Sequence, residues 1–345
     1  MPDPHTLAAE AAPLPARSAA DTAPYDSASW PIAAALLQYP GRKPDGSLVQ
    51  DAPANEWVDT LSQVSAVGFN AVDLTDSWLK PGDLSAGRLA ELNTALSLSG
   101  VQAPVLSIVR TSVLDREHGD ANFAYTMRSI AAAAEIGAGT LSLGLHQQLT
   151  AEQQERLWFW TAQGAGDPPG DPETWDLAVK RFRAIGQEAA RYNMQVSLEL
   201  YEDTYLGTAD SAVRLIEDIG LANVGINPDI GNLVRLHRPI ESWQEILHKT
   251  LPYTNYWQVK NYFRDENPET GAITSLPAPL ELGFINYRQA VQQAVAAGFN
   301  GVFCCEHYGG DGLGISAMNQ RYLRTLLKSA LTPACSSAQF QETIP

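Results

Sequence analysis

Four oxygen-bearing side chains stand at the ends of short apolar runs in the second half of the chain. They occur in the segments SLELYED, NPDIGN, WQVKN and CCEHYGG, as Glu199, Asp229, Gln258 and Glu306. If these runs are parallel strands of one barrel, their carboxyl ends lie on one side and the side chains converge. Carboxylates so close together repel one another unless a cation lies between them. Oxygen ligands suit Mn2+ or Mg2+, so the pattern predicts a divalent-metal site.

A structural role is the alternative for each of these acids. A single carboxylate can cap a helix N-terminus or pair with a cation such as Lys260 or Arg235. For one acid taken alone the two roles carry equal weight. Four such positions in successive runs favour the metal site. Lys260 is itself a catalytic candidate, because it follows the same run as Gln258.

His146 is a second candidate for proton transfer. It directly follows another apolar run, in SLGLHQQL. An imidazole titrates near neutral pH and could therefore carry a proton at this place. A loop histidine that hydrogen-bonds to the backbone is the equally weighted alternative.

The elements that must position these residues are eight short apolar runs. Several are apolar without interruption, as expected for parallel strands buried on both faces. The runs span residues 34–39, 70–75, 103–109, 140–145, 195–200, 224–229, 256–260 and 301–306.

Helical patterns alternate with these runs, for example at 56–67, 87–99, 126–136, 175–192 and 287–297. Repeated strand–helix units imply a parallel sheet with right-handed crossovers. Eight units predict an α/β fold closed into a single (β/α)8 TIM barrel, and the chain is long enough for one such domain. We expect the barrel at residues 30–332, an N-terminal arm at 1–29 and a C-terminal tail at 333–345. The Ala- and Pro-rich arm is either flexible or a clamp on a neighbouring subunit, and its composition favours flexibility.

Two segments, 146–170 after strand 4 and 261–284 after strand 7, are longer than the repeat requires. Loops at this face of a barrel commonly form substrate lids or subunit contacts. Their aromatic residues include Trp158, Trp160 and Tyr262, which we expect to stack on a sugar or an aromatic aglycone. Packing against a partner subunit is the alternative.

The charge and composition of the chain argue against several classes of function. The net charge of −16 argues against nucleic acid, because that affinity comes mainly from Lys and Arg on phosphates. The sequence contains no run of roughly 20 apolar residues, so no membrane span is expected. Cys304 and Cys305 are expected as buried strand residues, and with only three cysteines a reducing cytoplasm is predicted. The glycine-rich turn GGDGLG (309–314) carries Asp311, which would oppose a phosphate, so a non-phosphorylated substrate is favoured.

The motifs SLELYED, NPDIGN, WQVKN and CCEHYGG, in this order and at these strand ends, resemble the sugar phosphate isomerase/epimerase family. These are the xylose-isomerase-like TIM barrels, and the likeness runs from about residue 31 to 330. The resemblance implies that Glu199, Asp229 and Glu306 bind one metal, Mn2+ or else Mg2+ or Co2+. It also implies that Glu199 and Glu306 shuttle a proton beside a substrate carbonyl.

Two departures from the family pattern stand out. The family's strand-7 histidine is replaced by Gln258, and the histidine three residues after the strand-6 aspartate is replaced by Asn232. We place Asn232 among the substrate-binding residues. Endonuclease IV, which shares this barrel, depends on a histidine-rich metal cluster, and six histidines are too few here.

The resemblance implies an enzyme that enolises a non-phosphorylated keto-sugar. The most specific expectation is cleavage of the C–C bond of 3-keto-C-glycosides, as in the catalytic subunit of C-glycoside deglycosidases. That branch implies an oligomer and a smaller β-rich partner subunit. A ketose 3-epimerase, a sugar isomerase and a keto-inositol dehydratase are alternatives within the family. The missing strand-7 histidine keeps a different class open, a sugar-binding barrel without catalysis.

Overall fold

Eight parallel strands form the centre of the molecule, as the sequence predicts. The structure is a computed structural model that describes residues 25–332. The sheet order is β6-β5-β4-β3-β2-β1-β10-β7, which follows the chain around a nearly closed barrel. The strands are β1 Ile32–Ala35, β2 Ala71–Thr75, β3 Gln102–Ser107, β4 Thr140–Leu143, β5 Gln195–Glu199, β6 Val224–Asn227, β7 Tyr256–Val259 and β10 Val302–Cys305. The first strand lies earlier than predicted, because residues 36–38 form a 3-10 turn.

The seam between β6 and β7 is closed by side chains more than by backbone. A single parallel bridge joins Ile226 to Thr254 there. Asn227 accepts a hydrogen bond at Oδ1 from the Gln258 backbone N–H (2.9 Å) and donates from Nδ2 to Gln258 Oε1 (2.7 Å). This amide pair takes the place of the missing ladder and sets the register of β7 at the position of the predicted metal site.

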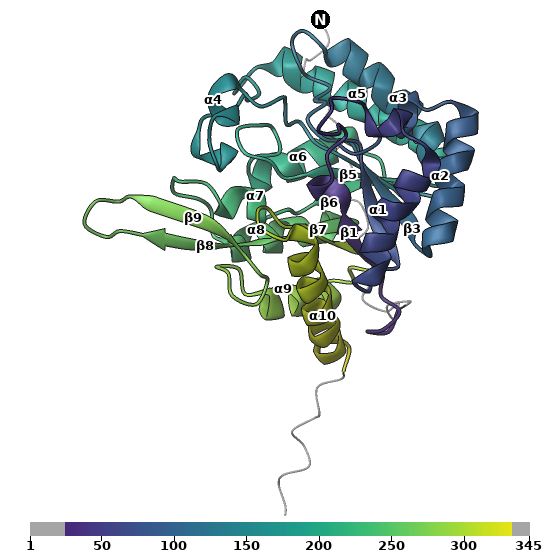
Figure 1. Ribbon diagram of the computed structural model, residues 1–345. Coiled ribbons are helices and arrows are strands. Elements are labelled where there is room, and N and C mark those ends of the chain that lie inside the picture. The colour runs from purple at the N-terminus through teal and green to yellow at the C-terminus, as the bar shows by residue number, and fades with distance from the viewer. Residues whose placement is uncertain (1–24, 333–345) are drawn as a thin grey trace, which may run out of the picture.

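Helices surround the barrel and cover the outer faces of the strands (Figure 1). The amphipathic pattern explains this placement: α6 buries Leu215 and Ile216, begins at the Thr208 cap and ends at Gly220 in the left-handed region that glycine tolerates. The helices are α1 Ala54–Ala66, α2 Ala86–Ser99, α3 Gly119–Glu135, α4 Ala151–Gln154, α5 Pro172–Ala190, α6 Ala209–Ile219, α7 Gly231–Val234, α8 Trp243–Thr250, α9 Tyr287–Ala296 and α10 Gly312–Leu331. Helix α3 begins seven residues before the predicted segment.

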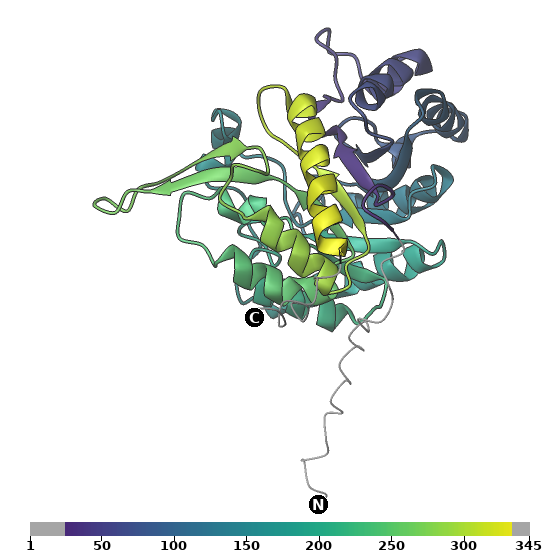
Figure 2. The same cartoon turned by 90° about the horizontal axis from the view of Figure 1, so that it is seen from below.

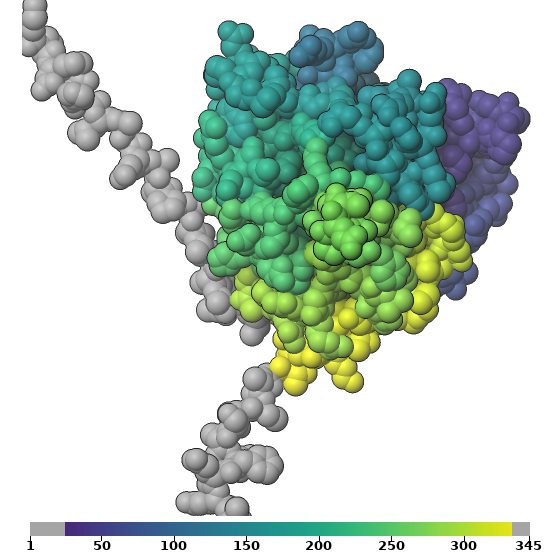
Figure 3. Space-filling model, turned by 90° about the vertical axis from the view of Figure 1, so that its left-hand side faces the viewer, coloured from purple at the N-terminus to yellow at the C-terminus, as the bar shows by residue number. Residues whose placement is uncertain are grey.

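The long segment after β7 contains an antiparallel hairpin that the sequence analysis did not predict. Its strands are β8 Asn261–Glu266 and β9 Ile273–Ala278. Figures 1 and 2 show the hairpin extending away from the barrel, and Figure 3 views its tip end-on. Arg264 fastens its base, because the guanidinium donates to the carbonyls of Val234 and Arg238. The segment after β4 contains only α4 and a 3-10 turn.

The chain ends and the cysteines can be compared with their predictions only in part. Residues 25–29 of the predicted arm contact α10, where Arg324 donates to the Ser27 carbonyl (3.0 Å). The rest of the arm and the tail at 333–345 lie outside the described residues. Cys304 and Cys305 are buried and unpaired in β10, as predicted. Between residues 25 and 332, none of the helices is long and apolar enough to cross a membrane.

The buried carboxyl group of Asp76, just after β2, makes the free energy of unfolding depend on pH. Its Oδ1 accepts a hydrogen bond from the Val109 N–H (2.8 Å), which ties the end of β3 to β2. Burial raises the pKa of Asp76 to about 7, from an ordinary value of 3.8. Between about pH 4 and pH 7, Asp76 is therefore protonated in the folded protein and ionised in the unfolded chain. The contribution of Asp76 to the free energy of unfolding therefore falls as pH rises from about 4 to about 7 and is constant above that pH.

The variant Asp76→Asn tests this assignment. Asparagine keeps an acceptor for Val109 but cannot ionise, so the variant should raise the free energy of unfolding at pH 8 by about 1–3 kcal/mol. At pH 4.5 the gain should be small. Urea unfolding at the two pH values measures it, with the exposed Asp176→Asn as control. An equal change at both pH values would contradict the assignment.

Candidate active site

The carboxyl ends of the strands bring the three predicted acids into one buried group. Glu199 is the last residue of β5, Asp229 lies two residues after β6, and Glu306 follows β10. All three side chains are buried. Asp229 and Glu306 share a partner in Lys260, whose Nζ lies 2.7 Å from Asp229 Oδ2 and 2.7 Å from Glu306 Oε1. The pairing with Lys260 that was the structural alternative is therefore present for two of the acids.

One ammonium does not balance three carboxylates. Burial, and then the charge of Asp229, raise the pKa of Glu199 to about 8. Burial raises the pKa of Asp229 to about 6, although Lys260 opposes the shift. Burial favours the neutral form of Lys260, but the charges of Asp229 and Glu306 outweigh it and hold its pKa well above the ordinary value. With all carboxylates ionised the group carries an excess of two negative charges.

This excess and the free oxygen atoms fit a divalent cation. Asp229 Oδ1 and Asn232 Oδ1 are buried and accept no hydrogen bond from the described residues. Within residues 25–332, however, no three His, Cys, Asp or Glu side chains are arranged around a common point as metal ligands. A bound cation would compete with the Lys260 ammonium for the Asp229 and Glu306 oxygens. Glu199, Asp229 and Glu306 would hold it, and this ligand set stays a prediction.

Gln258 is engaged by its neighbours. Its Oε1 accepts from Asn227, and its Nε2 donates to Asp73 Oδ2 (3.3 Å). The same Asp73 oxygen accepts from Ser107 Oγ and from Tyr256 Oη, both at 2.7 Å. Burial raises the pKa of Asp73 to about 6. Gln258 thus joins a polar layer inside the barrel, and its role as a metal ligand also remains a prediction. Asp73 was not predicted as part of the site, although an acidic residue inside the apolar run AVDLT could have indicated a buried polar position.

A cavity of about 260 Å3 opens onto this group at the barrel mouth. Its polar lining includes Glu199, Glu306 and Asn232. Asn232 replaces the family's second histidine, and it donates from Nδ2 to Glu199 Oε1 (2.7 Å) and to the Leu200 carbonyl (3.0 Å). Its amide therefore orients Glu199 as well as facing the cavity.

His146 lines the same cavity and stacks on Tyr201, with ring centroids 4.7 Å apart. Both ring nitrogens are buried, and neither has a hydrogen-bond partner among the described residues. The backbone contact that was the alternative for this histidine is thus not found there. Burial, followed by the charge of Arg110, holds the pKa of His146 well below its ordinary value. The imidazole is therefore neutral and resists protonation, but it can still form a hydrogen bond with a bound ligand.

The aromatic residues predicted to bind substrate pack mainly against each other. Trp158 stacks on Trp160 at 5.1 Å, and Trp160 meets Tyr262 edge-on at 5.4 Å. None of the three lines the mouth cavity, which takes its aromatic walls from Phe159, Tyr201 and Tyr308.

Beneath the aromatic cluster lies a buried ion pair that the sequence analysis did not assign. Arg235 is fully buried and donates to both carboxylate oxygens of Glu202 at 3.0 and 3.1 Å. Its guanidinium also lies over the rings of Phe159, Trp160 and Tyr201. The pair fixes the loops after β5 and β6 to each other.

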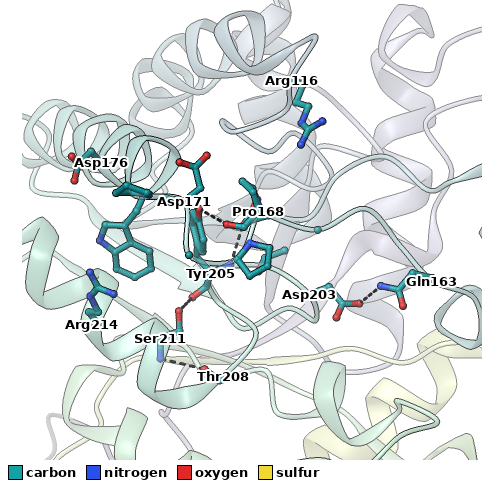
Figure 4. A pocket seen from close by; sticks show the side chains of 17 residues that line it. Arg116, Gln163, Pro168, Asp171, Asp176, Asp203, Tyr205, Thr208, Ser211 and Arg214 are labelled. Atoms are coloured by element: carbon teal, nitrogen blue, oxygen red, sulfur yellow. Dashed lines mark hydrogen bonds between the residues drawn. The ribbon is translucent and has the colours of Figure 1, made fainter.

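A larger hollow, of about 860 Å3, lies outside the mouth, where the loop before α5 meets the loop before α6. Figure 4 shows Tyr205 at its centre, with Asp171 and Ser211 close by. Its polar groups mostly bond to one another: Tyr205 Oη donates to the Pro168 carbonyl, and Ser211 Oγ donates to the Tyr205 carbonyl. It contains none of the predicted site residues, so we take the smaller cavity as the candidate active site.

A (β/α)8 barrel with buried acids at its mouth defines the class of protein, and comparison with known sequences gives the family. The xylose isomerase-like TIM barrel family matches residues 61–326, and the chain belongs to it.

Three known proteins illustrate the relationship. A xylose isomerase-like TIM barrel protein from Mycobacterium smegmatis, solved in complex with magnesium, is 46% identical, with a TM-score of 0.86 over 89% of this chain and 100% of that one. The 3-keto-D-glucoside 4-epimerase YcjR from E. coli shares the fold at 14% identity, with a TM-score of 0.60 over 86% and 99% of the chains. The probable L-ribulose-5-phosphate 3-epimerase UlaE of Mycoplasma pneumoniae is 34% identical over 65 residues, 19% of this chain and only 21% of that protein's length.

The variant Lys260→Met tests the charge balance of the site. In protein freed of divalent cations at pH 8, three buried carboxylates would lose their counter-ion, and the free energy of unfolding should fall by about 3–5 kcal/mol. Added Mn2+ should restore part of this loss, since it supplies the missing positive charge. Urea unfolding with and without Mn2+ measures both effects, and the exposed Lys180→Met serves as control. A loss that neither Mn2+ nor acidification to pH 5 reduces would refute the charge balance.

Proposed function

We propose that this protein is a divalent-metal-dependent enzyme that removes a proton next to the carbonyl group of a non-phosphorylated keto-sugar. The observation that carries the proposal is the pairing of two buried glutamates, Glu199 and Glu306, in one small cavity with an excess of negative charge. Two acids flanking a sugar carbon can accept a proton on one side and return it on the other.

Each residue at the cavity has a separate role in the proposed reaction. Glu199, whose pKa is raised to about 8, can hold or release a proton near neutral pH. Glu306 is fixed by Lys260, which also orients Asp229. Mn2+ or Mg2+, held by Glu199, Asp229 and Glu306, would polarise the substrate carbonyl. The aromatic walls of Phe159, Tyr201 and Tyr308, the last of these after β10, exclude water and offer faces for a sugar or an aglycone.

Cleavage of 3-keto-C-glycosides is the specific reaction that we propose. Loss of the proton at C2, beside the C3 carbonyl, allows the bond between C1 and the aglycone to break. The electron pair of that bond leaves with the aglycone carbon, which takes up a proton, and the sugar becomes an unsaturated ketone. Two features favour this branch over a simple epimerase: the neutral His146 lines the cavity and can form a hydrogen bond with the aglycone, and Gln258 stands in place of the usual histidine.

Epimerisation is the second candidate, because Glu199 and Glu306 both face the cavity and could act on opposite sides of one carbon. A keto-inositol dehydratase would use the same first step, and a sugar-binding barrel would use none. We further propose a cytoplasmic oligomer with a smaller β-rich partner. The projecting hairpin, with Phe263 and Leu276 exposed on paired positions, offers a contact surface for it.

Exchange of substrate hydrogen with solvent tests the shared first step. Glu199→Gln and Glu306→Gln should each reduce deuterium incorporation from D2O into a keto-sugar by at least about 1,000-fold, because the proton acceptor is lost. Thermal unfolding should show that both variants are folded. The exposed Glu135→Gln is the matched control. Full exchange in either active-site variant would rule out the mechanism.

A substrate panel with Mn2+ present separates the branches. We expect release of the aglycone from a 3-keto-C-glucoside and none from the unoxidised C-glucoside, since only the ketone acidifies the C2 hydrogen. Chromatography of the products measures both reactions. Turnover of the unoxidised C-glucoside would contradict the lyase branch, and epimerisation of a free ketose without C–C cleavage would favour the epimerase.

A further inference from the structure

Arg110 differs from the other cations near the barrel mouth because it has no acidic partner. Among residues 25–332 it is the only lysine or arginine that lines the mouth cavity. Lys260 is shared by Asp229 and Glu306, and Arg235 is paired with Glu202. No carboxylate in residues 25–332 lies within ion-pair distance of the Arg110 guanidinium.

The backbone around Arg110 is held firmly in an uncommon conformation. Its φ is +55°, in the left-handed region that non-glycine residues seldom adopt. The Asp76 carboxylate accepts the N–H of the preceding Val109, and Gln148 Nε2 donates to the Arg110 carbonyl at 2.7 Å. Strain of this kind persists where surrounding contacts fix it, commonly at ligand-binding positions.

The side chain is oriented by stacking, which leaves its hydrogen-bonding edge largely unused. The guanidinium lies over the Phe159 ring at 4.7 Å and near the Tyr201 ring at 5.9 Å. One donor, Nη1, bonds to the Gln147 carbonyl at 3.2 Å. A guanidinium has five N–H donors in a planar fork that matches a carboxylate in two parallel bonds.

We propose that Arg110 binds a carboxylate on the substrate, so that the enzyme binds an acidic keto-sugar more tightly than the corresponding neutral one. The proposal rests on the function proposed above, since it places the carboxylate of that keto-sugar at the rim of the same cavity. A single cation with a planar edge matches a singly charged carboxylate. A doubly charged phosphate would meet one cation only, with Glu199 and Glu306 in the same small space.

Binding of two matched probes to the full-length, Mn2+-loaded protein tests the proposal. Methyl β-D-glucuronoside and methyl β-D-glucoside differ only in carrying a carboxylate or a CH2OH group at carbon 6. Calorimetry should show that the wild-type protein binds the glucuronoside about tenfold more tightly or better, as a charge-assisted pair allows. Arg110→Gln should remove this preference and leave glucoside binding within about twofold. Arg110→Lys should retain part of it, because the charge remains.

The controls make each outcome decisive. Arg116→Gln, in the separate outer hollow, should behave as wild type. Equal binding of both probes by the wild-type protein, or equal weakening of both by Arg110→Gln, would overturn the proposal, as would stronger competition by inorganic phosphate than by the glucuronoside. Thermal unfolding confirms that the variants are folded. A carboxylate preference that persists while no keto-sugar exchanges deuterium would leave this binding site standing and sink the proposed function alone.

Discussion

Three carboxylates buried around one ammonium are the constraint on which the barrel mouth depends. Glu199, Asp229 and Glu306 approach one another because three strands of a parallel barrel end at the same face, and Lys260 offsets only one of their charges. Buried charge without compensation is costly, so the site must take up a proton or a cation. This cost raises the pKa values of Glu199 and Asp229. A site that must bind a proton or a metal is also one that can move a proton.

The surrounding structure keeps this unfavourable group in place. Below it, Asp73 gathers hydrogen bonds from Ser107, Tyr256 and Gln258, and Gln258 joins Asn227 across the seam of the barrel. Gln258 therefore couples the site to barrel closure. Above it, the pairing of Arg235 with Glu202 ties together the loops after β5 and β6. The acids are consequently held between two polar networks, with the mouth cavity as their opening.

Much of this arrangement follows from the sequence. Eight apolar runs identified the strands, and the acids at their ends were correctly predicted to lie together, because strand direction in a parallel barrel leaves one possible meeting place. The position of Lys260 was also accessible, since it stands two residues from Gln258 and shares its side of the strand. The hairpin at 261–278 was missed because β8 is rich in charged residues and β9 contains Pro277. Arg110 could not be found from sequence: its role depends on where three loops meet, and loop conformation is set by tertiary contacts.

Calorimetric titration with Mn2+ at pH 7, repeated in buffers of different ionisation enthalpy, tests the central claim most directly. Binding of the metal to Glu199 must displace the proton that a pKa of about 8 keeps there. We expect one saturable Mn2+ site and the release of about one proton per metal ion. The Asp229→Asn variant should lose this site. Absence of saturable binding, or binding without proton release, would contradict the central claim.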